Sequence, residues 1–263
     1  MILVIDAGNT NIVLGVYESR DKLRMCSRIS MDRAKTSDQF AVEIRDILRL
    51  YDISEQEITG AILSCVVPQV SIALKNAVRK ILDCEVLTVG PGMKTGMQIR
   101  VDNPNEVGAD IIVGCVAALD KYPVPCVVID MGTVTKMVVL DRDRAMIGAV
   151  FMPGVRISAE SLSEKTAQLP HVALDAPPKV VGTGTSACIR SGIIYGHASM
   201  IDGLADRIEE QVGEKCTFVV TGGHAASVFP HCRRKMIYDN QLLLDGLYLL
   251  YCKNAKDMTD RKA

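Results

Sequence analysis

The chain has 263 residues, of which 48% are hydrophobic and 23% charged, and its formal net charge is −1. This composition is typical of a globular protein, and the length suits two domains of about 120 residues each. The near-zero charge argues against a field for nucleic acid, and the lack of tryptophan and low aromatic content argue against base stacking. We therefore expect no nucleic-acid partner.

The start of the chain and its cysteines suggest a cytoplasmic protein. An apolar segment begins at once, without a basic leader or a cleavage site, and no apolar run reaches the roughly 18 residues of a membrane span. Nine cysteines are scattered without a C-x-x-C pair, and the four histidines lack metal-ligand spacing. We expect a cytoplasmic protein with reduced thiols, no membrane attachment and no zinc site.

In the first half, predicted strands alternate with predicted helices. Strands are expected at residues 2–5, 12–17, 23–29, 58–66 and 85–89, and helices at residues 37–50, 68–81 and 107–119. Ser37 can cap the first of these helices. The two prolines of Lys121–Pro125 mark the best boundary between domains. We expect an N-terminal domain over residues 1–121 and a C-terminal domain over residues 122–263.

The second half begins with a predicted hairpin and is then mostly helical. The hairpin spans residues 126–141, and a Pro-Gly turn follows at Pro153-Gly154. Helices are expected at residues 157–169, 186–196, 200–212 and 241–254, and a strand is expected at residues 217–220. The alternation of strands and helices predicts an α/β fold.

One loop occurs twice, as Val4–Asn11 and as Val128–Thr135. Each copy has an apolar strand, an aspartate, a glycine turn flanked by small polar residues, and a second apolar strand. A single D-x-G-x-T motif could be a plain hairpin turn. Two copies about half the chain apart favour a duplicated domain. The pattern predicts two similar α/β domains that face each other across a nucleotide cleft.

The composition of the two loops suits phosphate binding. A turn glycine lets backbone N–H groups approach phosphate oxygens, and threonine and asparagine side chains add donors. We predict that Gly8-Asn9-Thr10 and Gly132-Thr133 clamp the phosphates, with Asn11 and Val13 completing the first loop. Asp6 ends a buried strand, where a carboxylate is costly unless it meets a cation. It is predicted to face Mg²⁺ through water.

Two further glycine motifs were considered as nucleotide sites. Gly222 and Gly223 follow a predicted strand and would let adenosine approach closely, although a plain strand-to-helix turn explains them equally well. Gly182–Ala187 matches G-x-G-x-x-A, and Asp202 lies about 20 residues further on, as in a dinucleotide fingerprint. The short preceding strand and the missing second strand argue against NAD binding.

Asp110 is the candidate general base. Transfer of a γ-phosphoryl group to an alcohol needs a carboxylate positioned to accept the hydroxyl proton. Asp110 lies in the first turn of a predicted helix, where the helix dipole favours its ionised form. From the sequence alone, a solvent-facing aspartate at a helix start is an equally good interpretation.

In this order, the motifs resemble those of type III pantothenate kinase, a family of the acetate kinase, sugar kinase, Hsp70 and actin superfamily. The resemblance runs from Met1 to about Asn254. It rests on the segments Asp6–Asn11, Asn103–Asp110, Asp130–Thr133, Pro153–Ser158, Thr166–Pro170, Ser191–Gly196 and Thr221–Gly223. It implies two actin-like, ribonuclease H-like domains.

The resemblance also implies a reaction and the residues that perform it. The reaction is the ATP-dependent phosphorylation of pantothenate to 4'-phosphopantothenate, the first step of coenzyme A biosynthesis, by a homodimer. Asp110 would be the general base, within a substrate segment that includes Gly108 and Ala109. Thr133 would contact ATP, and Thr185 would contact the substrate. Asp130 would bind a monovalent cation, either K⁺ or NH₄⁺.

The chain departs from the family pattern mainly on the substrate side. The family usually has an arginine where this chain has Ile111, and commonly a tyrosine where it has Val101; an asparagine commonly stands at Gly184. A missing charge-assisted contact costs about 1.5–3 kcal/mol. Two alternatives therefore stay open, a non-catalytic nucleotide-binding relative and a kinase of another small hydroxylated metabolite.

Two basic residues could compensate for the missing arginine, and a third lies on the nucleotide side. Arg100 and Arg156 are candidate substitutes for the missing arginine. Lys136 stands where the family commonly has a threonine, and it could serve as another phosphate contact.

Overall fold

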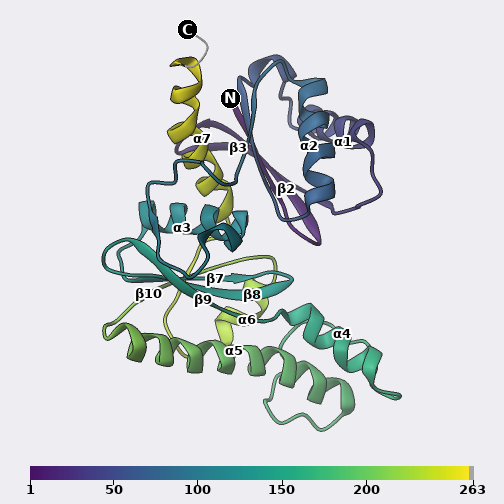
Figure 1. The fold of residues 1–263 in the computed structure, drawn as a ribbon. Coiled ribbons are helices and arrows are strands. Elements are labelled where there is room, and N and C mark those ends of the chain that lie inside the picture. The colour runs from purple at the N-terminus through teal and green to yellow at the C-terminus, as the bar shows by residue number, and fades with distance from the viewer. Residues whose placement is uncertain (261–263) are drawn as a thin grey trace. The chain divides into compact units, whose positions relative to one another are not determined.

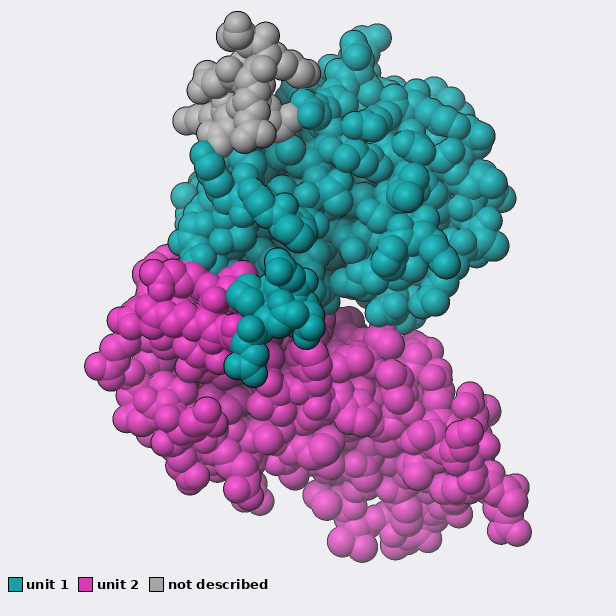
Figure 2. All heavy atoms as spheres, in the orientation of Figure 1, with its two compact units in different colours: residues 1–97, 102–120, 241–263 teal, residues 98–101, 121–240 magenta. Residues whose placement is uncertain are grey.

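The computed structural model describes residues 1–260 and divides the chain into two compact units (Figures 1 and 2). Unit 1 comprises residues 1–97, residues 102–120 and the segment from Gln241 onward. Unit 2 comprises residues 98–101 and 121–240. Each unit has its own hydrophobic core.

Unit 1 is built on a five-stranded sheet with the order β3-β2-β1-β4-β5. The central strand β1 pairs antiparallel with β2 and parallel with β4. Its neighbouring side chains Leu3 and Val4, which point to opposite faces, are both fully buried, as expected for a strand covered on both faces. The strands are β1 (Ile2–Ala7), β2 (Asn11–Ser19), β3 (Lys22–Ser30), β4 (Gly60–Cys65) and β5 (Val86–Thr88).

The helices of unit 1 cover both faces of this sheet (Figure 1). Helices α1 and α2 pack on each other, and α7 packs on β1 and β4. The helical segments are α1 (Ser37–Leu50), α2 (Pro68–Ile81), α3 (Ala109–Lys121), α7 (Leu242–Asp260) and the short 3-10 turns Glu55–Glu57 and Pro104–Glu106. The cap of α1 is Thr36 and not Ser37, because Thr36 and Gln39 form a reciprocal capping box.

Unit 2 is built on a six-stranded sheet with the order β11-β10-β7-β8-β9-β6. Here β7 pairs antiparallel with β8 and parallel with β10. The strands are β6 (Gln98–Ile99), β7 (Cys126–Met131), β8 (Val134–Leu140), β9 (Ala145–Pro153), β10 (Thr217–Thr221) and β11 (Ile237–Tyr238). The helical segments are α4 (Val155–Lys165), α5 (Thr185–Val212), α6 (Ala225–Val228) and the 3-10 turn Phe229–His231.

The two sheets repeat one topology. In each, the first strand of the unit's hairpin lies between its antiparallel partner and a later parallel strand: β2-β1-β4 in unit 1 and β8-β7-β10 in unit 2. Strand β6 is an additional edge strand of the second sheet. The mixed α/β architecture with two sheets confirms the predicted fold class.

Helix α5 is one continuous helix of 28 residues, where the sequence predicted two. The predicted break falls near Ser199, but the buried face continues across it through Ile194, Ala198 and Ile201. These residues keep the helical spacing of three to four, so packing against the core holds the segment helical. The helix ends at Gly213, whose φ of 82° is left-handed.

The compact units differ from the predicted sequence halves at two places. The segment from Gln241 onward belongs to unit 1, and residues 98–101 belong to unit 2. The first difference arises because α7 packs on the first sheet, and the second because β6 pairs with β9. Within residues 1–260, no helix has the length and apolar character to cross a membrane.

Candidate functional site

The two duplicated loops occupy equivalent places in their sheets. Asp6 lies near the end of β1, opposite Val13 on β2 and beside Ser64 on β4. Asp130 lies near the end of β7, opposite Lys136 on β8 and beside Thr221 on β10. Each aspartate therefore has a hydroxyl-bearing residue as its neighbour on the parallel strand.

In the first loop, the residues with phosphate-binding potential lie at the surface. Asn9 and Thr10 are exposed. The Gly8 N–H donates to the Asn11 carbonyl at 2.9 Å, which closes the turn. Arg33 Nη2 donates to Asn9 Oδ1 at 3.3 Å, so a guanidinium lies beside the loop. Arg33 could not be predicted from the sequence, because no local motif links it to the loop around Asn9, more than twenty residues earlier.

In the second loop, close backbone packing determines the shape. Gly132 and Thr133 connect β7 to β8, and their carbonyl oxygens lie against Gly154. A Cβ at Gly154 would collide with both oxygens. The Pro-Gly turn predicted at Pro153-Gly154 therefore supports the loop from behind, and glycine is required there because of this contact.

The loop that follows β10 packs against the same hairpin. Gly222 has a φ of 99°, and a Cβ there would lie 2.6 Å from Asp130 Oδ1 and 2.6 Å from the Met131 nitrogen. The His224 N–H donates to the Met131 carbonyl at 3.0 Å. Gly223 is exposed beside them. The structure thus brings the predicted Gly222-Gly223 motif next to the second phosphate loop and Asp130.

Asp130 forms an ion pair that the sequence analysis did not predict. Lys136 Nζ lies 2.9 Å from Asp130 Oδ2, and the exposed fractions of the two side chains are 14% and 16%. The sequence contains a local clue to this pair, because Lys136 interrupts the apolar strand β8. A lysine in such a strand requires a carboxylate partner.

The candidate base Asp110 lies in the first turn of α3 and is partly exposed. The Ile111 N–H donates to Asp110 Oδ1 at 2.9 Å. A Cβ at Gly108 would lie 2.7 Å from the same oxygen. The Gly108-Ala109-Asp110 segment therefore folds so that the carboxylate lies close to the backbone at the start of α3.

The residues predicted on the substrate side have different environments. Ile111 is buried, with 8% of its surface exposed, and Val101 is partly exposed. Thr185 is exposed at the start of α5. Arg156 is exposed in the first turn of α4. Arg100 instead pairs with two carboxylates of its own unit. Arg156 is thus the better candidate of the two for the missing guanidinium.

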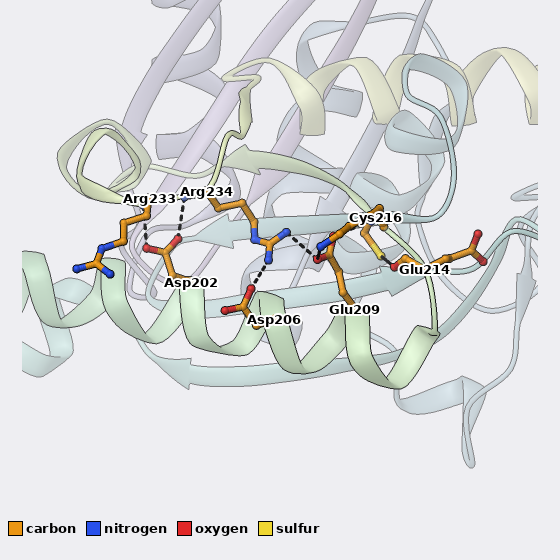
Figure 3. A network of polar contacts seen from close by, with 8 residues as sticks. Asp202, Asp206, Glu209, Glu214, Cys216, Arg233 and Arg234 are labelled. Carbon is orange, nitrogen blue, oxygen red and sulfur yellow. Dashed lines mark hydrogen bonds and ion pairs between the residues drawn. The ribbon is translucent and has the colours of Figure 1, made fainter.

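The dinucleotide interpretation does not match the structure around Asp202 (Figure 3). Asp202 lies within α5 itself, and its carboxylate accepts the backbone N–H groups of Arg233 and Arg234. A dinucleotide fingerprint would need this acid at the end of a second strand. The hollow of about 600 Å³ that Asp202 helps to line contains none of the predicted site residues.

Two of the thiols are strongly held in their protonated form. Burial raises the pKa of the Cys126 thiol and that of the Cys232 thiol to about 12 each. A protonated thiol is a poor nucleophile and metal ligand. Among the described residues, no group of three His, Cys, Asp or Glu side chains is arranged to hold a metal ion.

Comparison with known proteins identifies the family. A family model described as type III pantothenate kinase matches residues 2–207. The chain belongs to the type III pantothenate kinase family. A type III pantothenate kinase of an Exiguobacterium species is 41% identical over 256 residues, covering 97% of this chain and 100% of the relative. That of Exiguobacterium sibiricum is 39% identical over 254 residues, with the same coverage.

Solved structures with low sequence identity share the fold. A conserved putative Baf family transcriptional activator from Campylobacter jejuni superposes with a TM-score of 0.58 at 19% identity, covering 97% of this chain and 99% of its own. The activator of the 2-hydroxyisocaproyl-CoA dehydratase from Clostridium difficile, with bound ADPNP, gives a TM-score of 0.55 at 11% identity, covering 100% and 97%. At such identities the likeness concerns the fold alone.

Family membership confirms the resemblance found in the sequence. It also confirms the predicted enzyme class, a kinase that uses ATP, and the predicted reaction, phosphorylation of pantothenate for coenzyme A biosynthesis. The roles of individual residues, the divalent and monovalent cations and the homodimer stay predictions.

Proposed function

We propose that this chain transfers the γ-phosphoryl group of ATP to the primary hydroxyl of pantothenate, with Asp110 as the general base. The observation that carries this assignment is the placement of Asp110 at the start of α3, inside the segment matched by the family. A carboxylate within hydrogen-bond reach of an acceptor hydroxyl can take its proton during transfer.

The proposed step needs few groups. Asp110 accepts the hydroxyl proton as the acceptor oxygen forms a bond to the γ-phosphorus, while the bond from that phosphorus to the bridging oxygen breaks and ADP leaves. Catalysis then depends on positioning and on charge stabilisation around the phosphoryl group. Asp110 is partly exposed, so an acceptor can reach its carboxylate.

The phosphate contacts are assigned to the two loops. In unit 1, Gly8–Asn11 offers backbone N–H groups, and the exposed Asn9 and Thr10 side chains add donors. In unit 2, Gly132-Thr133 offers the equivalent contacts, with the Gly222-Gly223 turn beside it for adenosine. Val13, opposite Asp6, borders the first loop.

The divalent cation is assigned to Asp6. Its Oδ1 atom is buried at the end of β1, and carboxylate oxygens are the ligands that Mg²⁺ prefers. Mg²⁺ keeps several waters and takes few protein ligands, so one carboxylate with bridging water suits it. When bound, Mg²⁺ neutralises phosphate charge during transfer.

The acceptor pocket is assigned to Gly108–Ile111, Val101 and Thr185. Because Ile111 replaces the usual arginine, we expect weaker pantothenate binding than the family pattern gives, with Arg156 as the candidate replacement. The homodimer that the family resemblance implies stays a prediction. The predicted cytoplasmic location stays a prediction.

A kinase of another small hydroxylated metabolite is the second candidate function. The specific observation that favours it is Ile111, which is aliphatic and buried beside the proposed base. An isoleucine at this position suits an acceptor that is less polar than the acceptor bound by the usual arginine. A non-catalytic relative is disfavoured, because a pure binding protein has no use for Asp110.

The test is ADP release from ATP with and without pantothenate, in the wild type and in Asp110→Asn. We expect pantothenate-dependent turnover in the wild type and a loss of about 10²–10⁴-fold in kcat in the variant. The dissociation constant for ATP should not change, since Asp110 is not assigned a nucleotide contact.

Asp83→Asn is the matched control, because Asp83 is an exposed aspartate of the same unit. It should behave as the wild type. If Asp110→Asn turns over as fast as the wild type, the assignment of the base is refuted. ATP binding without turnover on pantothenate would favour the second candidate, and a screen of hydroxylated metabolites would then identify the acceptor.

A further inference from the structure

The charge of Asp130 is compensated from within the chain. Its Oδ2 atom lies 2.9 Å from the Lys136 ammonium, and both side chains are mostly buried. The two residues face each other in the register of the β7–β8 hairpin. Cross-strand partners in an antiparallel pair have neighbouring Cβ atoms, so the hairpin itself holds this ion pair together.

The other carboxylate oxygen of Asp130 lies beside two glycines. Oδ1 lies against Gly222, where an added Cβ would be only 2.6 Å away, and against Gly132, where it would be 3.6 Å away. A monovalent cation bound to Asp130 would have to share Oδ2 with an ammonium or displace it. Two cations on one carboxylate repel each other, so the residues present do not fit the additional ion that the family resemblance implies.

The duplicated hairpin of unit 1 provides an internal comparison. There the residue opposite Asp6 is Val13, which brings no charge. The lysine is therefore a feature of the second hairpin only. A lysine ammonium is a compact point charge on a flexible stem, and it carries the same charge as K⁺ or NH₄⁺.

We propose that Lys136 is a built-in substitute for the monovalent cation, so that this kinase binds nucleotide and turns over without K⁺ or NH₄⁺. Lys136 lies three residues after Thr133 and places its charge at the second phosphate loop, where it can also face a phosphate oxygen. Lys136 is thus a positioning residue that fixes Asp130 and the loop. This inference rests on the proposed function for one readout only, the turnover with pantothenate. The measurement of ATP affinity needs no acceptor.

The first experiment measures wild-type ATP affinity in KCl and in tetramethylammonium chloride at equal ionic strength. A fluorescent nucleotide analogue displaced by ATP provides the readout, which requires no acceptor. We expect the two dissociation constants to agree within about twofold, as do the turnover rates with pantothenate. A wild type that needs K⁺ for either readout, by about tenfold or more, overturns the proposal.

The second experiment uses Lys136→Thr and Lys136→Met, of which the methionine variant keeps the length and the strand packing of the side chain. In tetramethylammonium chloride, both should lose about 10-fold or more in ATP affinity, the loss expected for one charge-assisted contact. K⁺ or NH₄⁺ should restore most of it in the threonine variant, which has a hydroxyl in place of the ammonium. A threonine variant that folds, as judged by its melting temperature, and binds ATP equally in both salts overturns the proposal.

Lys235→Ala is the control, because Lys235 is an exposed lysine of the same unit, and it should match the wild type in both salts. The two proposals fail separately. Absence of turnover with pantothenate in every salt refutes the acceptor, while K⁺-dependent ATP binding by the wild type refutes the role of Lys136.

Discussion

At the scale of single residues, the site depends on glycines that allow close backbone approach. Gly222 combines a left-handed φ of 99° with contact distances that leave no space for a side chain. It holds the turn after β10 against Asp130 and Met131. The turn after β10 therefore packs tightly against Asp130, and it supports the Lys136 pair and the second predicted phosphate loop.

Replacing this glycine should damage fold and site together. For Gly222→Ala we expect a loss of about 2–4 kcal/mol in the free energy of unfolding, from left-handed backbone strain and overpacking. ATP affinity should also fall, because Asp130 must move. Urea unfolding and nucleotide titration measure the two effects.

Gly203→Ala is the control for that substitution. Gly203 lies within α5, and an added Cβ there meets nothing within 4 Å. Alanine favours a helix over glycine by up to about 1 kcal/mol, so this variant should be as stable as the wild type or slightly more stable. Equal stability of the two alanine variants would contradict the packing argument at Gly222.

At the scale of elements, an ion network around the buried Glu209 links α5 to the segments around β10 (Figure 3). Glu209 is mostly buried on α5 and pairs with Arg234 and Lys215 at 2.9 Å each. It also accepts the Cys216 N–H at 3.0 Å, while Arg234 pairs with Asp206. These contacts link one helix to residues on either side of β10.

The network makes a pH-dependent contribution to stability. Burial of Glu209 opposes its ionisation, but hydrogen bonds from Cys216, Lys215 and Arg234 outweigh burial and lower its pKa below the ordinary 4.5. A carboxyl group whose pKa is lowered by folding stabilises the protein above its unfolded-state pKa, and this stabilisation is lost as the pH falls through the folded-state pKa.

Glu209→Gln should therefore be less stable than the wild type by about 1–3 kcal/mol at neutral pH. The difference should shrink as the pH falls below 4.5, the ordinary pKa of the glutamate. Urea unfolding at several pH values measures it. Glu210→Gln, at the exposed neighbouring position, should show no such difference. A gap that stays constant down to the acid transition would contradict an ionic role for Glu209.

At the scale of the whole molecule, the chain does not divide into two contiguous halves. The last described helix, α7, belongs to unit 1 and packs on β1 and β4, while Gly246 lies against the backbone of Val113 in α3. Unit 1 is thus complete only when the segment from Gln241 onward has been made. Contacts between such distant segments carry a loop-closure cost and slow folding.

The contribution of α7 can be measured at Leu247, which is fully buried. Leu247→Ala should lower the free energy of unfolding by about 2–5 kcal/mol, because it removes buried methyl groups and leaves a cavity. Leu50→Ala is the same substitution at a leucine that is 79% exposed in the same unit, and it should change stability by less than about 0.5 kcal/mol. Equal effects would mean that α7 does not complete the core of unit 1.

Much of the site could be predicted because its signals are local. Asp6, Asp130 and their glycine turns are contiguous motifs, and Asp110 follows directly from the Gly-Ala-Asp start of a helix. Arg33 could not be found in this way, since its contact with Asn9 depends on how β3 ends beside the first loop. The Lys136–Asp130 pair needed the hairpin register, which depends on the length of the turn.

By itself, the sequence determined the duplicated α/β pattern, the two loop motifs, the candidate base and the family. These features are encoded in neighbouring residues, whose backbone and side-chain preferences act over one turn or one strand. Only the tertiary structure decided that α5 is continuous, that α7 completes unit 1 and that a lysine already pairs with Asp130. Each of these depends on packing, because burial of apolar surface and pairing of buried charges act between segments that are far apart in the chain.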